Sequence, residues 1–190
     1  MKTISVFNHV TLDGFYAGPD GEIDWFKSIK KDPALDKYLH GQSQGGSSLM
    51  MGRTTYAMMK SYWPTPEAIK SDPEMARVMD HGRKVVFSKT LKKVEEGPNW
   101  KNITLVHDID RKQILKLKEK DDFTILGSGS IVQQLANLGL IDAYQLVVVP
   151  IVLGAGKPLF KDVRATNLKL VEEKSFKNGL VVLKYKPKAN

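Results

Sequence analysis

Residues 123–130 read Phe-Thr-Ile-Leu-Gly-Ser-Gly-Ser, a short apolar run that passes directly into a turn of glycine and serine. After the turn, Ile131, Leu135 and Leu138 recur at helical spacing, and Gly139 predicts the end of that helix. A strand that continues through such a turn into a helix is the building unit of a parallel α/β sheet. The segment therefore predicts an α/β fold.

The same turn is suited to a phosphate. Glycine lets the backbone approach a ligand closely, and the first N–H groups of a helix are unpaired and lie at the positive end of its dipole. We predict that Gly127, Ser128, Gly129, Ser130 and the adjoining Ile131 contact a pyrophosphate. The segment is neither the full dinucleotide fingerprint nor a Walker A loop, so a tight strand-to-helix connection is the alternative interpretation.

A second strand-like run, residues 47–54, reads Ser-Ser-Leu-Met-Met-Gly-Arg-Thr and ends in a similar turn. Gly52 leads into Arg53, whose guanidinium offers a forked donor to phosphate. We expect Thr54 to cap a short helix over 55–59. The alternative is a surface arginine beside a helix cap.

A third run, residues 84–90, reads Lys-Val-Val-Phe-Ser-Lys-Thr. Ser88 and Lys89 suit a phosphate monoester, such as the 2′-phosphate that distinguishes NADP from NAD, although a solvated turn is the alternative. The carboxyl ends of parallel strands meet at one edge of a sheet, where ligands bind. We therefore predict that the three turns together bind a nicotinamide dinucleotide phosphate.

The remaining pattern predicts one α/β domain over residues 1–190. Strand-like runs alternate with helical segments until residue 168, and this alternation favours a parallel sheet. Residues 168–185 leave no room for a helix, and Asn178-Gly179 predicts a hairpin turn. We expect a mixed sheet, mainly parallel with antiparallel C-terminal strands, flanked by helices over 33–40, 73–79, about 111–118 and 131–138.

Composition limits the protein class. Of 190 residues, 42% are apolar and 26% charged, which is typical of a soluble globular domain. Because the chain has no cysteine, disulfides and thiolate chemistry are excluded, and a reducing cytoplasm is expected. No signal-peptide pattern opens the sequence, and the apolar run 146–153 is too short to span a bilayer. From that short run we expect no membrane span, and because the four histidines lack metal-ligand spacing we expect no metal.

The formal net charge of +8 attracts anions. The basic residues are scattered, and they form neither a long helical stripe nor a run interleaved with aromatic residues. We therefore favour a solvated basic surface that draws a small anionic ligand over one that binds nucleic acid.

Five segments in this order resemble a known family. They are Val-Thr-Leu-Asp-Gly-Phe-Tyr-Ala at 10–17, Met-Gly-Arg-Thr-Thr-Tyr at 51–56, Val-Phe-Ser-Lys-Thr at 86–90, Leu-Gly-Ser-Gly-Ser at 126–130 and Val-Pro-Ile-Val-Leu-Gly-Ala-Gly-Lys-Pro-Leu-Phe at 149–160. Together they resemble the dihydrofolate reductase-like fold, and most closely the riboflavin-biosynthesis reductase C-terminal (RibD C-terminal) domain proteins. The resemblance implies that fold, NADPH held across the three turns, and a homodimer.

The resemblance also implies a lid over the nicotinamide, formed by residues 17–20. Hydride transfer belongs to the cofactor, and a buried acid with a raised pKa would supply the accompanying proton. The predicted catalytic residues are Asp13 and Asp24, which flank this loop. Asp13 in an ordinary turn and Asp24 as a helix cap are the alternatives, and His9 is a further candidate.

The substrate side departs from dihydrofolate reductases. In those enzymes a pterin-binding carboxylate follows the loop tryptophan by about one and a half helical turns, whereas counting from Trp25 reaches Lys30. Residues 62–64, Tyr-Trp-Pro, are expected to wall a pocket for a flat ring, or to pack in the core. The sequence therefore predicts a stand-alone NADPH-dependent reductase of a small pyrimidine- or pterin-like substrate, similar to 5-amino-6-(5-phosphoribosylamino)uracil reductase. Dihydrofolate reduction, or a catalytically silent NADP-binding protein, is the alternative.

Overall fold

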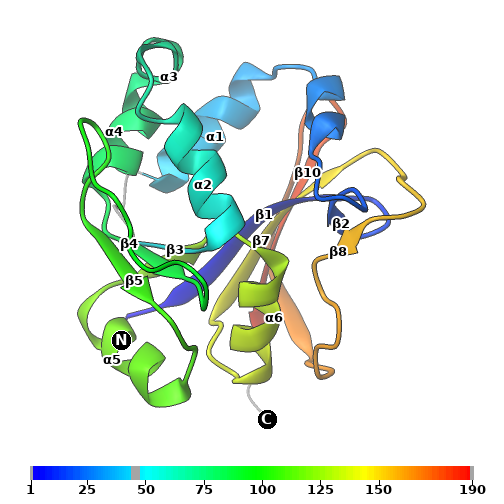
Figure 1. The fold of residues 1–190 in the computed structure, drawn as a ribbon. Helices are drawn as coiled ribbons and strands as arrows, with labels where there is room; N and C mark the ends of the chain where they lie inside the picture. Colours follow the sequence, from blue (N-terminus) through cyan, green and yellow to red (C-terminus); the bar gives the residue numbers. More distant parts are fainter. Residues whose placement is uncertain (1, 44–47, 189–190) are drawn as a thin grey trace.

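The computed structural model describes residues 2–43 and 48–188, so Ser47 of the second quoted segment lies outside it. Its main sheet has eight strands in the order β5-β4-β3-β6-β1-β7-β10-β9 (Figure 1). The strands are β1 Ile4–Thr11, β3 Ser48–Gly52, β4 Lys84–Phe87, β5 Ile103–Val106, β6 Phe123–Ile125, β7 Ala143–Val149, β9 Leu168–Ser175 and β10 Val181–Pro187.

Strand directions confirm the predicted mixed sheet. β1 pairs in parallel with β6 on one side and β7 on the other, and β3, β4 and β5 continue the parallel part. β10 is antiparallel to both β7 and β9. The β9–β10 hairpin turns at Gly179, whose φ of +86° is the left-handed conformation that an Asn-Gly turn requires. β7 ends at Val149, directly before Pro150, because proline cannot donate to the ladder.

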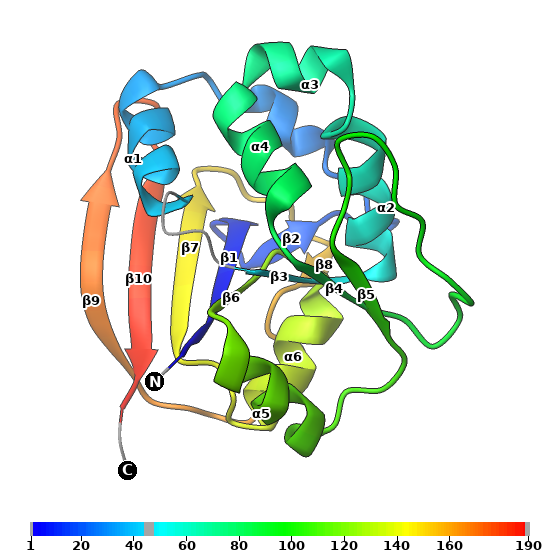
Figure 2. The ribbon, with the colours of Figure 1, turned by 90° about the vertical axis from the view of Figure 1, so that its left-hand side faces the viewer.

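Helices cover both faces of the sheet. The 3-10 helix η1 and helices α1 to α4 lie on one side, and α5 and α6 lie on the other (Figure 2). A separate two-stranded sheet pairs β2 Phe15–Ala17 with β8 Lys157–Pro158. The helices are η1 Asp24–Ser28, α1 Pro33–Ser43, α2 Arg53–Tyr62, α3 Pro66–Ser71, α4 Pro73–His81, α5 Arg111–Lys120 and α6 Gly129–Asn137. In the described part of the chain, no helix is long and apolar enough to cross a membrane.

Local sequence signals explain several helix ends. The side chain of Asp72 accepts a hydrogen bond from the Met75 N–H at 3.0 Å, so it caps α4. Asp110 caps α5, since its side chain accepts a hydrogen bond from the Gln113 N–H at 3.0 Å. The expectation for Thr54 was wrong: α2 begins two residues earlier, at Arg53, with Gly52 at its N-cap and no side-chain cap.

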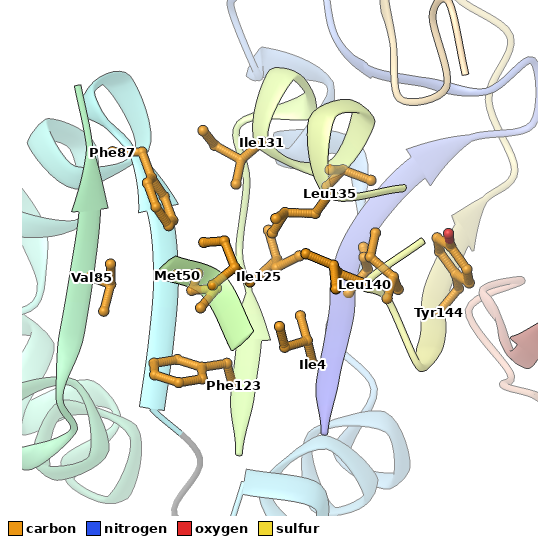
Figure 3. Packing of buried hydrophobic residues seen from close by; sticks show 14 of the residues in the cluster. Ile4, Met50, Val85, Phe87, Phe123, Ile125, Ile131, Leu135, Leu140 and Tyr144 are labelled. Carbon is orange, nitrogen blue, oxygen red and sulfur yellow. The ribbon is translucent and has the colours of Figure 1, made fainter. Parts of the chain in front are cut away.

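The largest core cluster holds α6 against the sheet. Ile4, Met50, Phe123 and Ile125 of the strands meet Leu135 of the helix, and each of these side chains is at most 1% exposed (Figure 3). Full burial of one such side chain contributes about 1.5–3 kcal/mol. This packing fixes the start of α6 at the end of β6, which is the glycine turn.

Candidate functional site

The three predicted turns lie side by side. They follow β4, β3 and β6, which are parallel neighbours in the sheet, so their carboxyl ends share one edge. The Gly52 N–H donates to the Gly127 carbonyl oxygen at 3.0 Å and ties the second turn to the glycine turn. The juxtaposition expected from the sequence is therefore confirmed.

The glycine turn needs its glycines. Gly127 has a φ of +116°, which side-chain-bearing residues rarely adopt. A Cβ on Gly52 would lie 2.7 Å from the Ser128 Oγ, and a Cβ on Gly129 would lie 2.4 Å from a ring carbon of Tyr16. No side chain caps α6; its Gly129 N–H bonds to Tyr16 and its Ile131 N–H to the Ser128 carbonyl, so in the described structure the Ser130 N–H is the donor of this turn that is left for a ligand. Burial raises the pKa of Tyr16, and this hydrogen bond partly offsets the rise.

The Arg53 side chain links the second and third turns. It is exposed, and its Nη1 donates to the Thr90 Oγ1 at 3.0 Å. The Lys89 side chain is also exposed, with its Nζ 3.8 Å from an Asp108 carboxylate oxygen. Two cations therefore stand at this end of the sheet, partly offset by one acid.

Ser88 and Ile131 have structural positions that differ from the predicted ligand contacts. The Ser88 Oγ accepts hydrogen bonds from the Thr90 and Leu91 N–H groups at 3.2 and 3.0 Å, so this hydroxyl shapes its own turn. Ile131 is 4% exposed and packs in the core (Figure 3), and its N–H donates to the Ser128 carbonyl. Both residues therefore support the turns, and their predicted contacts with a phosphate stay a prediction.

A cleft of about 790 Å³ opens beside the glycine turn. Gly127, Ser128 and Thr54 line one end of it, and β1 and β6 contribute side chains to its floor. Helices α1, α2 and α4 contribute the walls, which are mainly apolar. Trp63 lines the cleft, and its Nε1 donates to the Sδ of Met59, one helical turn earlier. Trp63 of the Tyr-Trp-Pro segment therefore both lines a pocket and packs against other side chains.

Asp13 is not a buried acid. It is exposed, and one carboxylate oxygen accepts the N–H groups of Leu153 at 3.0 Å and Gly154 at 2.8 Å. The Thr11 hydroxyl donates to the other oxygen at 2.6 Å. These bonds, that of Thr11 first, hold the pKa of Asp13 below its usual value. The raised pKa expected for a proton donor is therefore wrong, and Asp13 instead joins the end of β1 to the 153–154 turn.

This environment predicts a pH-dependent effect of Asp13→Asn. A lowered folded-state pKa stabilises the protein above the unfolded value of 3.8, and that contribution is lost as the pH falls through the folded pKa. At pH 7 we expect the variant to melt a few degrees below the parent protein. The difference should vanish near pH 2, as measured by thermal melts across the range. An equal difference at both pH values would contradict this account.

Asp24 is also exposed. It begins η1, forms an ion pair with Lys27 at 2.5 Å and makes no side-chain cap, so neither the buried environment nor the cap expected from the sequence is present. The next residue, Trp25, is buried and stacks on Phe26 with 4.2 Å between ring centroids. The structure therefore places the aromatic pair, and not the acid, in the interior.

Two polar residues of β1 lie at the cleft. Asn8 lines it beside Gly127, and its buried Nδ2 has no hydrogen-bond partner in the described residues. The His9 ring lies 5.0 Å from the Phe26 ring and 5.5 Å from that of Phe7. Burial lowers the pKa of His9 to about 4, so its imidazole is neutral at pH 7. The sequence indicated His9 but not Asn8, whose only signal was its place in the first strand.

The lysine expected at the position of the pterin-binding carboxylate does not reach the cleft, so it gives no ground against dihydrofolate. Lys30 lies between η1 and α1, is exposed and does not line the cleft, because α1 begins only at Pro33. The carboxylate that α1 does present to the cleft belongs to Asp36. Near it, the His40 Nε2 lies 2.9 Å from an Asp72 carboxylate oxygen, and this hydrogen bond raises the pKa of His40.

Comparison with known proteins agrees with this architecture. The sequence model of the RibD C-terminal domain matches residues 2–182. The uncharacterized protein YyaP of Bacillus subtilis (strain 168) is 31% identical over 177 residues, which cover 93% of this chain and 90% of that protein.

Solved structures share the fold. A protein from Shewanella sp. PV-4 assigned to riboflavin biosynthesis superposes with a TM-score of 0.79, at 24% identity, over 98% of this chain and 99% of that one. A deaminase/5-amino-6-(5-phosphoribosylamino)uracil reductase of Thermotoga maritima gives 0.67 at 17% identity, over 98% of this chain and 57% of that one. Dihydrofolate reductase from Enterococcus faecalis, solved with NADP(H), gives 0.58 at 14% identity, over 98% and 97%. The predicted dihydrofolate reductase-like fold is therefore confirmed.

Proposed function

The chain belongs to the RibD C-terminal domain family, and on this premise we propose that it is a stand-alone NADPH-dependent reductase of a small pyrimidine- or pterin-like heterocycle. The observation that carries the proposal is the meeting of three phosphate-suited turns on neighbouring strands, of which the glycine turn and the turn after β3 line a cleft. Relatives of this fold include reductases, and one of them binds NADP(H).

The residues present fit the cofactor. Arg53 and Lys89 offer cationic donors for a phosphate monoester, and the uncapped starts of α2 and α6 offer N–H groups for a pyrophosphate. The unpaired Asn8 Nδ2 offers an amide donor beside Gly127. NADPH, when bound, supplies the hydride.

The chain's own residues would orient the substrate and leave a path by which a proton reaches it. The apolar cleft walls exclude water from a flat ring, while neutral His9 offers one hydrogen-bonding group on the floor. Asp13 and Asp24 are exposed, so in this proposal the proton comes from solvent, while Asp13 holds the 153–154 turn in place.

Selectivity for NADPH over NADH tests the cofactor assignment. We expect wild-type protein to bind NADPH at least about tenfold more tightly than NADH, which corresponds to about 1.4 kcal/mol for the 2′-phosphate contacts. Arg53→Ala and Lys89→Ala should each reduce this preference while leaving NADH affinity unchanged. Isothermal titration calorimetry measures both affinities.

Lys92→Ala is the matched control, because Lys92 is an exposed lysine three residues from Lys89 that bonds to neither turn in the described structure. It should keep the full NADPH preference. No NADPH binding at millimolar concentration in wild-type protein would exclude the reductase proposal.

Dihydrofolate is the second candidate substrate, and Asp36 is the observation in its favour. A carboxylate on the helix that walls the cleft could pair with a protonated pterin. NADPH oxidation with dihydrofolate, compared between wild-type and Asp36→Asn protein, decides between the two.

The homodimer and the cytoplasmic location expected from the sequence are further parts of the proposal. Light scattering after gel filtration measures whether the protein is a dimer.

A further inference from the structure

One wall of the cleft is an apolar surface, here called the methionine wall. It consists of Met58, Met59 and Trp63 of α2 with Met75 and Met79 of α4. Methionine side chains are flexible and polarizable, and their sulfur atoms make favourable contacts with aromatic rings. Such a wall suits a flat apolar ring, and it offers no hydrogen bonds to a sugar phosphate.

The charges around the cleft disfavour an anion. Asp36 and Asp72 line it from α1 and the start of α4. Lys184 also lines it, but its Nζ is already bound to the Gln42 side chain at 3.0 Å and the Glu172 carboxylate at 3.2 Å. Lys157 comes from β8, on the lid side, where its Nζ lies close to Gly21. His40 also lines the cleft, and its ring is hydrogen-bonded to Asp72. A phosphate beside the methionine wall would therefore meet Asp36 and two basic side chains, His40 and Lys184, that are already bonded to acids.

His9 supplies one polar group to the same space. Its ring stands on β1 between the rings of Phe7 and Phe26, and it makes no hydrogen bond to the described residues. A neutral imidazole can donate or accept one hydrogen bond without adding a charge. A ring carbonyl or ring nitrogen is the partner that such a group would select.

We propose that the substrate is an uncharged planar ring compound without a phosphate group, held against the methionine wall and aligned by His9. This inference rests on the proposed reductase function and narrows its substrate class. The hydride of NADPH and one proton from water add across a conjugated C=O or C=N bond of the ring. NADPH is oxidised to NADP⁺ and the ring is reduced by two electrons.

A pair of probes that differ mainly in charge tests this preference. They are 1,4-naphthoquinone and its 2-sulfonate, titrated calorimetrically into the full chain with NADP⁺ present and again without it. The chain has no cysteine, so the quinones cannot form thiol adducts. We expect the sulfonate to bind at least about tenfold more weakly, equivalent to about 1.4 kcal/mol, although the net charge of +8 attracts anions in general.

Met58→Lys and Leu115→Lys form a matched pair of variants. Met58 is 41% exposed and lines the cleft, whereas Leu115 is 39% exposed on α5 and does not. Met58→Lys should lower the preference for the uncharged probe at least about fivefold, because the added ammonium attracts the sulfonate. A fivefold change corresponds to about 1 kcal/mol, the effect expected of one partly exposed charge. Leu115→Lys should leave it unchanged. A preference below tenfold in wild type, or an unchanged preference in Met58→Lys, overturns the proposal.

His9 variants test alignment separately. His9→Phe should weaken 1,4-naphthoquinone binding about fivefold, the value of one neutral hydrogen bond, and His9→Gln should restore most of it. Equal affinity in His9→Phe and wild type contradicts the role of His9.

If NADPH binds and the sulfonate is preferred, the substrate inference fails and the reductase function stands. If NADPH does not bind but the uncharged probe is preferred, the reductase function fails and the cleft preference stands.

Discussion

Gly127→Ala is expected to weaken NADPH binding about 100-fold, or about 2.8 kcal/mol. Gly127 has a φ of +116°, and a Cβ there would lie 3.1 Å from the Thr55 Oγ1. Alanine must therefore move the backbone of the turn, which carries the Gly52–Gly127 hydrogen bond and the start of α6. Since N–H donors bind phosphate only when they point at it, a displaced turn loses this contact. Calorimetric titration of NADPH measures the loss.

Gly139→Ala is the control for backbone strain alone. Gly139 has a φ of +63° at the end of α6, and a Cβ there would have no heavy atom within 4 Å. Both variants should lose stability, by about 1–3 kcal/mol each, but only Gly127→Ala should lose cofactor affinity. Equal NADPH affinity in Gly127→Ala and wild type, with the fold intact by circular dichroism, would show that the glycine turn does not bind the cofactor.

Lys84→Met is expected to destabilise the fold by about 3 kcal/mol and to lower the Tm by about 6–12 °C. Lys84 is 0% exposed, and its Nζ donates to the carbonyl oxygens of Asp80, Gly82 and Lys101 at 3.0, 2.6 and 2.8 Å. The ammonium also lies 4.8 Å from the centroid of the buried Trp100 ring. Methionine fills a similar volume and removes a buried charge, but it leaves three carbonyls without these donors, and we expect that loss to dominate.

The pH dependence of the free energy of unfolding tests whether Lys84 causes this difference in stability. Burial lowers its pKa from 10.5 to about 8, while three carbonyl acceptors suit the protonated form at neutral pH. Between pH 8 and 10.5 the unfolded chain binds more protons than the folded chain. The contribution of Lys84 to the free energy of unfolding therefore rises with pH across this window. Wild-type protein should show this rise relative to Lys84→Met in urea titrations.

Lys101→Met is the matched control for that experiment, because the Lys101 side chain is exposed and only its backbone carbonyl contacts Lys84. It should melt within about 2 °C of wild type, since exposed substitutions typically change stability by less than about 0.5 kcal/mol. A Tm for Lys84→Met as high as that of Lys101→Met would show that the three hydrogen bonds contribute nothing net.

Much of the fold could be predicted because its signals are local. Residues 123–130 contain a strand, its turn and the start of a helix, and each depends on neighbouring residues alone. The cap at Asp72 and the hairpin turn at Gly179 are local in the same sense. Since parallel strands place their ends at one edge, the meeting of the three turns also followed from order along the chain.

The environments of the candidate site residues could not be predicted in this way. Asp13 accepts hydrogen bonds from N–H groups 140 and 141 residues away. Because of these contacts, the residue predicted to be an acid catalyst is an exposed carboxylate that stabilises a turn. Ile131 follows the glycine turn in sequence but points into the core. Asp36 reaches the cleft because α1 begins at Pro33, which counting from Trp25 did not reveal.

The sequence by itself determined which strands end in turns suited to phosphate, because glycine, serine and helix-start signals act over a few residues. The tertiary structure alone decided which donors are free, which acids are exposed and what lines the cleft. Those properties depend on burial and on partners distant in the chain, and both arise only when the sheet and helices pack. The proposed cofactor therefore follows from the sequence, whereas the proposed substrate class rests on the methionine wall and the neutral His9 of the folded chain.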